Sequence, residues 1–221
     1  MVLPFSSKAK VTITEGWYYS QAEKAIHGKS THGAVDFAAP RGTPVYAADD
    51  GYALSSYHSE NGGIWQDKEI GLGYGKFVQI WNPNTETFTL YSHLENIAEN
   101  VIYQEPTKSG GFWNSELLSN RSEPFLSKGT RVTKGDLIGY VGDSGLNWGY
   151  DETPTQRPDP KDYPSWDEAH LHFEVFHFDI NGKQLIDPYG LNADVKAYKL
   201  SSIKTGKTLW INDGEKAQFA R

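Results

Sequence analysis

Residues 170–178 read His-Leu-His-Phe-Glu-Val-Phe-His-Phe, and this stretch decides the fold. Apolar residues fill every second position over 171–175, which is the period of a β-strand with one face in a core. A strand rises about 3.3 Å per residue, so side chains two positions apart share a face at a spacing of roughly 6–7 Å. His170, His172 and Glu174 therefore lie on one face, and we predict that both histidines open toward one site.

The rest of the chain predicts a mainly β protein. Among 221 residues there are 7 Trp, 13 Tyr and 22 Gly, and long runs of strong helix formers are few. Residues 77–81 and 87–92 flank the turn residues Asn82-Pro83-Asn84, which predicts a hairpin with His93 just past its second strand. We expect short strands joined by tight turns.

The domain organisation expected is one domain over residues 1–221, with a core at about 28–190. Segments 101–127 and 146–168 interrupt the rhythm of short strands, and both are expected to be long loops. A functional role and a role as solvent-exposed insertions are equally compatible with these two segments. The extension over residues 191–221 is too short for another domain.

Charge and composition exclude several classes of function. The formal net charge is −7 and no basic run occurs, so a nucleic-acid partner is not expected. The absence of cysteine means that any metal must be bound by imidazole and carboxylate groups. No stretch is apolar enough to span a bilayer, and the first residues do not form a signal peptide. If the protein is exported, we expect its signal to have been removed from this chain, and we expect a monomer.

His32 and Asp36 form a second candidate motif. Four positions along a straight strand separate two side chains by roughly 13 Å, too far for one metal ion. The segment must therefore bend, and Gly33 makes a bend easy to build beside His32. Two imidazoles and one carboxylate would leave one position of a tetrahedral Zn²⁺ open for water, as catalytic zinc requires.

Three segments in this order carry a resemblance to a known family. They are His-Gly-Ala-Val-Asp-Phe-Ala-Ala-Pro at 32–40, Tyr-Ser-His-Leu at 91–94 and His-Leu-His-Phe-Glu-Val at 170–175. Together they resemble the signature of the lysostaphin/LytM endopeptidases, the M23 metallopeptidases, and the likeness extends from about residue 28 to residue 190. The family often has glycine where this chain has Ala34, so a slightly different bend is expected there.

This resemblance implies a fold, an antiparallel β-sheet folded around a groove, together with a function and a set of site residues. His32, Asp36 and His172 would be the ligands of Zn²⁺, while His93 and His170 would line the site around the attacking water. Which of these two histidines takes the proton of the water stays open. The implied activity is hydrolysis of stem or cross-bridge peptides in bacterial peptidoglycan, which places the protein in a secreted, periplasmic or cell-wall setting.

Two other classes of function remain. A non-catalytic module of the LytM type would bind and activate a separate cell-wall hydrolase, although such modules typically lack zinc ligands and all five positions are filled here. Residues 129–139 also resemble a pattern of lipoyl and biotinyl carrier domains, but no modifiable lysine motif accompanies it. A carrier predicts no bound zinc, so metal analysis separates it from the other two.

Overall fold

Strands dominate the molecule, as the sequence predicts. The computed structural model describes residues 1–17, 28, 31–65, 68–109, 112–145, 148–149, 169–187 and 218–221. Within these ranges the only helical elements are the short η1 (Glu116–Leu118) and α2 (Glu123–Lys128). None of the helices described there has the length and apolar character needed to cross a membrane.

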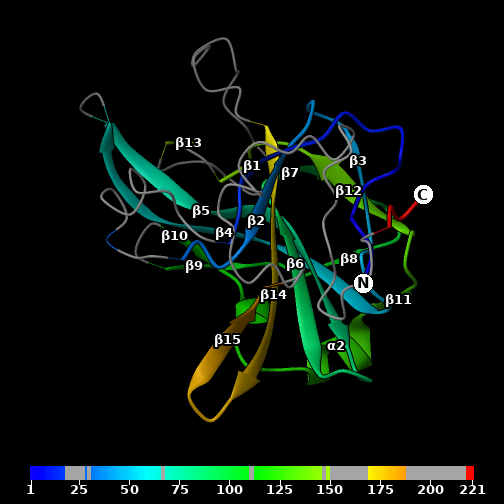
Figure 1. The fold of residues 1–221 in the computed structure, drawn as a ribbon. Coiled ribbons are helices and arrows are strands. Elements are labelled where there is room, and N and C mark those ends of the chain that lie inside the picture. Colours follow the sequence, from blue (N-terminus) through cyan, green and yellow to red (C-terminus); the bar gives the residue numbers. More distant parts are fainter. Residues whose placement is uncertain are drawn as a thin grey trace.

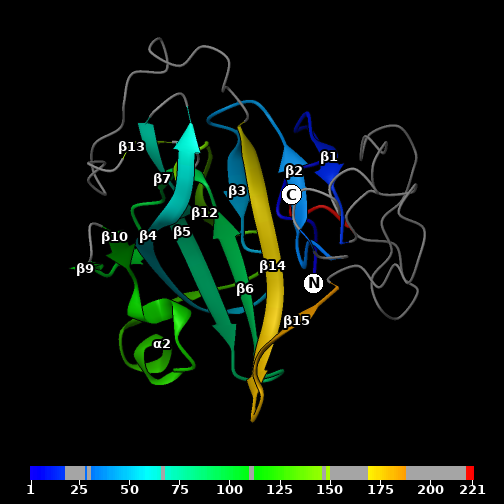
Figure 2. The same cartoon turned by 90° about the vertical axis from the view of Figure 1, so that its left-hand side faces the viewer.

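A large, mostly antiparallel sheet forms the body of the protein (Figures 1 and 2). Its main path, in spatial order, is β1 (Thr12–Glu15), β2 (Val35–Ala38), β14 (His170–Asp179), β6 (Thr87–Ser92), β5 (Lys68–Asn82), β4 (Gly51–Trp65) and β11 (Thr130–Val132). Off this path, β13 (Trp148–Gly149) pairs with β5, β15 (Gly182–Ile186) with β14, and β8 (Ile102–Tyr103), in parallel, with β4.

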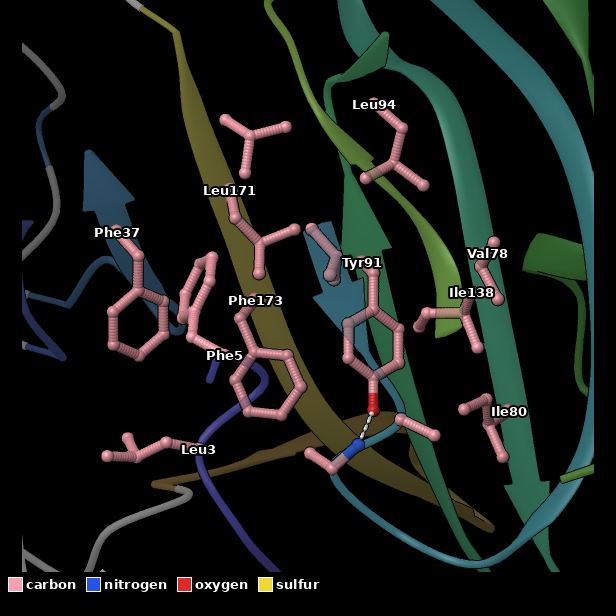
Figure 3. Packing of buried hydrophobic residues seen from close by; sticks show 14 of the residues in the cluster. Leu3, Phe5, Phe37, Val78, Ile80, Tyr91, Leu94, Ile138, Leu171 and Phe173 are labelled. Atoms are coloured by element: carbon pink, nitrogen blue, oxygen red, sulfur yellow. Dashed lines mark hydrogen bonds between the residues drawn. The ribbon is translucent and has the colours of Figure 1, made fainter. Parts of the chain in front are cut away.

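β14 lies between β2 and β6, and its two faces differ as the sequence predicts (Figure 2). Leu171, Phe173 and Val175 are buried in the main core, whose close-up shows Leu171 and Phe173 packed near Phe37 and Tyr91 (Figure 3). The opposite face of the same strand begins with two histidines. One strand thus supplies both the core and the site.

A second, three-stranded sheet closes the main core. It consists of β3 (Pro44–Tyr46), β12 (Leu137–Val141) and β7 (Leu94–Ile97), with β12 in the centre. Its side chains Leu94 and Ile138 reach toward Val78 and Tyr91 of the large sheet (Figure 3). The packing of these two sheets fixes the connection from β6 to β7, where His93 lies.

A second hydrophobic cluster lies on the other face of the large sheet. It joins apolar residues of four strands to η1 and α2, namely Leu54, Phe77, Phe88, Leu90, Leu117, Phe125 and Phe176. Phe176 continues the face of β14 that begins with His170 and His172. That face is therefore covered by apolar packing at one end and carries polar groups at the other.

The hairpin predicted around Asn82 is present as β5 and β6, which pair from Val78↔Tyr91 to Asn82↔Thr87. The Asn82 side chain accepts a hydrogen bond of 2.9 Å from the Asn84 N–H, the local bond typical of such turns. His93 follows β6 directly, as expected.

The structure differs from the sequence expectation at three places. Residues 101–127 are not an unbroken loop, since they contain β8, β9 (Thr107–Ser109), β10 (Phe112–Asn114), η1 and the start of α2. The core also begins before residue 28, because Leu3, Phe5 and Ile13 are buried in it. Leu3 further forms a bridge to Phe219, so the last residues return to the body of the molecule. Most of the predicted loop 146–168 lies outside the described residues.

Candidate metal centre and active site

The register of β2 against β14 sets Asp36 directly opposite His172. Side chains of directly opposed residues in antiparallel strands project on the same side, with Cβ atoms about 4.5–5.5 Å apart. The Asp36 Oδ1 atom consequently lies 2.9 Å from Nδ1 of His172. This pair joins two segments that are far apart in the sequence.

The predicted bend brings His32 to the same carboxylate. Gly33 has φ 82°, in the left-handed region that disfavours other residues, and the backbone N–H of His32 donates to the Trp17 carbonyl at 2.9 Å. As a result His32 Nε2 lies 3.5 Å from Asp36 Oδ2. The four-residue spacing that forbids a shared metal in a straight strand is thereby overcome.

Hydrogen bonds assign the free nitrogen of each ring. The Nδ1 atom of His32 lies 3.2 Å from the Gly16 carbonyl, which only accepts, so Nδ1 carries the proton and Nε2 keeps its lone pair. On His172, Nε2 lies 3.2 Å from Oε1 of Glu174, so Nε2 donates and Nδ1 faces Asp36. The lone pair of His32 Nε2 and the Asp36 carboxylate are thus directed together, and Nδ1 of His172 would add a lone pair once a cation replaced the proton between it and Asp36.

This donor set fits a zinc ion. One ligand atom from each of His32, Asp36 and His172 lies within 4.8 Å of the others. Ligand atoms about 2.0–2.1 Å from a tetrahedral zinc are separated by about 3.3 Å. The His32–Asp36 separation of 3.5 Å is close to that value, while the His172–Asp36 separation of 2.9 Å is that of a direct hydrogen bond.

The pKa values of Asp36 and His172 are shifted in opposite directions by their contact. Burial raises the pKa of Asp36, but the neighbouring His172 and His32 outweigh it and hold that pKa well below its usual range. Burial lowers the pKa of His172, yet Asp36 and Glu174 raise it to about 9. Without a metal, the positive charge of protonated His172 thus compensates the charges of Asp36 and Glu174, which lie at its two ring nitrogens. A divalent cation at the same place would replace it.

His93 and His170 lie beside these ligands. The His93 ring centroid is 4.8 Å from that of His170 and 5.8 Å from that of His172. His170 Nε2 lies 3.9 Å from Oδ2 of Asp36. The structure therefore brings together all five residues that the sequence selects.

The backbone of His93 adopts an unusual conformation, with φ 60°. Strained conformations of this kind persist where the surroundings over-determine them, often at functional sites. Here the His93 N–H donates to the Tyr74 carbonyl at 2.8 Å, and Nδ1 lies 2.9 Å from the Ser144 carbonyl. Nδ1 therefore donates, and the lone pair of Nε2 remains available. Burial lowers the pKa of His93 well below its ordinary value, and His170 and His172 lower it further.

The segment that carries the Ser144 carbonyl is itself fixed. The Ser144 hydroxyl accepts from the Lys76 N–H at 2.9 Å and donates to the Leu94 carbonyl at 2.7 Å. Next to it, Arg41 donates to Asp143 and, at 2.7 Å, to Glu95. The group that orients His93 is thus tied to three other parts of the chain.

Sequence reasoning missed two residues of this region, Tyr74 and Lys183. The Tyr74 hydroxyl donates to Oε1 of Glu174 at 2.9 Å, and the Lys183 ammonium pairs with Oε2 of the same carboxylate. The sequence places Glu174 on the histidine face but assigns it no role. The two-residue period reveals Glu174, but no local pattern points to Tyr74 or Lys183, because they come from β5 and β15.

The sequence was compared with known proteins. Residues 30–112 match the profile of Peptidase family M23, and this match confirms the resemblance drawn from the motifs. The matched range includes His32, Asp36 and His93 and ends before β14. Comparison with curated proteins gives no match.

Several solved structures are similar to the chain. The catalytic domain of the prophage-encoded M23 protein EnpA from Enterococcus faecalis is 20% identical over 87% of this chain and 98% of its own, with a TM-score of 0.45. The catalytic domain of lysostaphin from Staphylococcus simulans is 21% identical over 82% and 90%, with a TM-score of 0.40. A putative glycyl-glycine endopeptidase lytM from Ruminococcus gnavus is 23% identical over 85% and 56%, with a TM-score of 0.45. At TM-scores this low the likenesses carry no weight for function.

Proposed function

Because residues 30–112 match peptidase family M23, we propose that this protein is a zinc-dependent endopeptidase that hydrolyses peptide bonds of bacterial peptidoglycan. The observation that carries the proposal is the convergence of His32, Asp36 and His172 beside two further histidines. His170 and His172, which lie beyond the matched range, complete this arrangement. A non-catalytic module would not need them.

The proposed chemistry divides the work between the metal ligands and their neighbours. A bound Zn²⁺ would polarise the scissile carbonyl and lower the pKa of the attacking water. His93 is suited to accept the proton of that water, because its Nε2 is unprotonated and burial keeps the ring neutral. His170, whose ring lies 4.8 Å from that of His93, is suited to stabilise the charge that develops on the carbonyl oxygen.

The substrate class rests on the resemblance to the lysostaphin and LytM peptidases. We propose that the stem or cross-bridge peptides of the cell wall are cleaved, in a secreted, periplasmic or wall-associated setting, by a monomer. The formal net charge of −7 is consistent with a partner other than nucleic acid.

The test is mass spectrometry of the soluble fragments that the zinc-loaded protein releases from purified peptidoglycan. New peptide ends made by the wild-type protein, and not by a His170→Ala variant at the same zinc content, are the expected result and identify the bond. Wall chemotypes with glycine-rich and with direct cross-bridges are compared side by side. If no chemotype releases fragments, the endopeptidase proposal fails, and the activating module becomes the better account.

A further inference from the structure

Glu174 is a buried carboxylate that the proposed chemistry does not use. Its exposed fraction is 6%, and it lies on β14 two residues beyond His172, on the same face of the strand. An ionised carboxylate in such a place is costly unless it is paired and hydrogen-bonded. Its partners therefore show what the site requires of it.

Three groups bind the two oxygens of the Glu174 carboxylate. Oε1 accepts from the Tyr74 hydroxyl at 2.9 Å and from Nε2 of His172 at 3.2 Å. Oε2 pairs with the Lys183 ammonium. These partners come from β5, from β14 itself and from β15, so the carboxylate is fixed from three strands.

Lys183 also makes contacts with residues other than Glu174. Its ammonium lies 4.2 Å from the centroid of the Phe176 ring, a cation–π arrangement, and 3.4 Å from the Tyr74 hydroxyl. The positive charge beside Glu174 is thus fixed by the packing of the β14–β15 hairpin. Burial raises the pKa of Glu174, but His172 and Lys183 outweigh it and lower that pKa to about 2.

We propose that Glu174, held by Tyr74 and Lys183, is a positioning residue that selects the ring nitrogen with which His172 faces the metal. An imidazole can turn either nitrogen toward a cation. Because Glu174 accepts a hydrogen bond from the Nε2–H group, the ring presents Nδ1 to the side of Asp36, at 2.9 Å from Oδ1. Carboxylate partners of this kind also raise the basicity of a ligating histidine. The inference rests on the proposed function, since it assumes that the site binds zinc.

A simple ion pair does not explain this arrangement. Pairing with Lys183 occupies only Oε2, whereas Oε1 carries two further hydrogen bonds, one of them to a metal ligand. A purely structural role predicts that replacing Glu174 lowers the stability of the metal-free protein alone. A positioning role predicts that zinc affinity and ligand geometry change as well.

The experiment measures zinc affinity by competition with a chromophoric chelator and ligand geometry from the absorption spectrum of the cobalt(II)-loaded full chain. Loss of an outer hydrogen-bond partner of a ligating histidine typically costs 10–100-fold in affinity. We expect about 10-fold weaker zinc binding for Glu174→Gln and a smaller loss for Lys183→Met. The Gln184→Met variant, next to Lys183 but bonded to Asp179, serves as the matched control and should bind zinc like the wild type.

A double variant keeps the test decisive if removal of the carboxylate alone leaves Lys183 unpaired and the protein unfolded. Glu174→Leu combined with Lys183→Met removes both charges, and we expect about 100-fold weaker zinc binding with a shifted cobalt spectrum. Unchanged zinc affinity and cobalt spectra in the folded variants would overturn the inference while leaving the zinc site intact. A wild-type protein that binds neither metal would instead refute the proposed function, and the inference with it.

Discussion

At the scale of single residues, the proposed mechanism separates side chains that would hold the metal from side chains that would act on the substrate. Asp36 contacts His172 at 2.9 Å and His32 at 3.5 Å, whereas His170 stands 3.9 Å from the same carboxylate. His93 forms its hydrogen bond with the Ser144 carbonyl and not with the Asp36 carboxylate. Substitutions within the cluster should therefore fall into two groups.

The first prediction distinguishes these groups. His172→Ala should lose zinc and activity together, because one of three ligands disappears. His170→Ala should keep its zinc and lose activity by about 100-fold or more, the usual scale for a group that assists proton transfer or stabilises charge. Metal content by mass spectrometry and turnover of a peptide substrate check both. Full turnover by the His170→Ala protein would contradict the role given to that residue.

The second prediction concerns Gly33, whose φ of 82° permits the bend at His32. A side chain there costs about 1–2 kcal/mol of stability from the left-handed backbone alone. An added Cβ would also lie 2.5 Å from Cδ1 of Leu185, at the end of a flexible, 42% exposed side chain that can move. We expect Gly33→Ala to lower the urea midpoint and to weaken zinc binding, because His32 is displaced.

The matched control for this variant is Gly182→Ala. Gly182 also has positive φ, 103°, but no atom lies within 4 Å of an added Cβ, and the residue is the first of β15, directly after the β14–β15 turn. It should lose stability and keep its zinc affinity. Equal zinc affinities in both variants would show that the bend at Gly33 does not position His32.

At the scale of elements, Tyr91 joins β6 to the loop after β3. It is fully buried, and its hydroxyl accepts a hydrogen bond of 2.8 Å from the Ala48 N–H (Figure 3). Burial raises the pKa of Tyr91 above its ordinary value. The unfolded chain ionises this group first as pH rises, so the folded state loses stability in that range.

The third prediction follows from this upward shift of the Tyr91 pKa. The contribution of Tyr91 is complete below about pH 10, where a free tyrosine is neutral, and it is lost as pH rises further toward the higher folded pKa. The free energy of unfolding should then fall by up to about 1.4 kcal/mol per pH unit more steeply in the wild type than in Tyr91→Phe. Urea titrations at about pH 9 and about pH 11 measure the difference. Parallel losses in the two proteins would contradict the prediction.

Elements also show what the sequence reveals and what it conceals. The alternation around Leu171 and the turn at Asn82 predict β14 and the β5–β6 hairpin, because both signals are local. Short elements such as β9, β10 and η1 in residues 101–127 have no such period, and only their tertiary contacts define them. Tyr74 and Lys183 are not predicted from the sequence for the same reason. Which residues of β5 and β15 lie near Glu174 depends on the pairing of strands that the sequence does not state.

At the scale of the whole molecule, the proposed metal binding would be coupled to folding. The three candidate ligands lie on or beside the adjacent strands β2 and β14, so the cluster exists only where these strands pair. A ligand that binds only the folded state stabilises it by about 2.7 kcal/mol at a concentration about 100 times its dissociation constant. For a chain of this size that corresponds to a rise in Tm of about 5–10 °C.

The fourth prediction is therefore that zinc raises the Tm of the chelator-treated protein by about this amount. His172→Ala should show no such rise at the same zinc concentration. Differential scanning calorimetry of both proteins, with and without zinc, provides the measurement. A rise of similar size in the variant would show that zinc stabilises the protein from another site.

The pairing of Asp36 with His172 also has a consequence for biosynthesis. The two residues are 136 positions apart in the sequence, and β14 leaves the ribosome after β2, β4, β5 and β6, the other strands of its sheet that surround the site. Contacts of such separation form slowly, because a long stretch of chain must be ordered before they contribute. A nascent or truncated chain without β14 lacks one candidate ligand and one neighbouring histidine, so the proposed hydrolytic activity should appear only after translation of the strand and closure of the sheet.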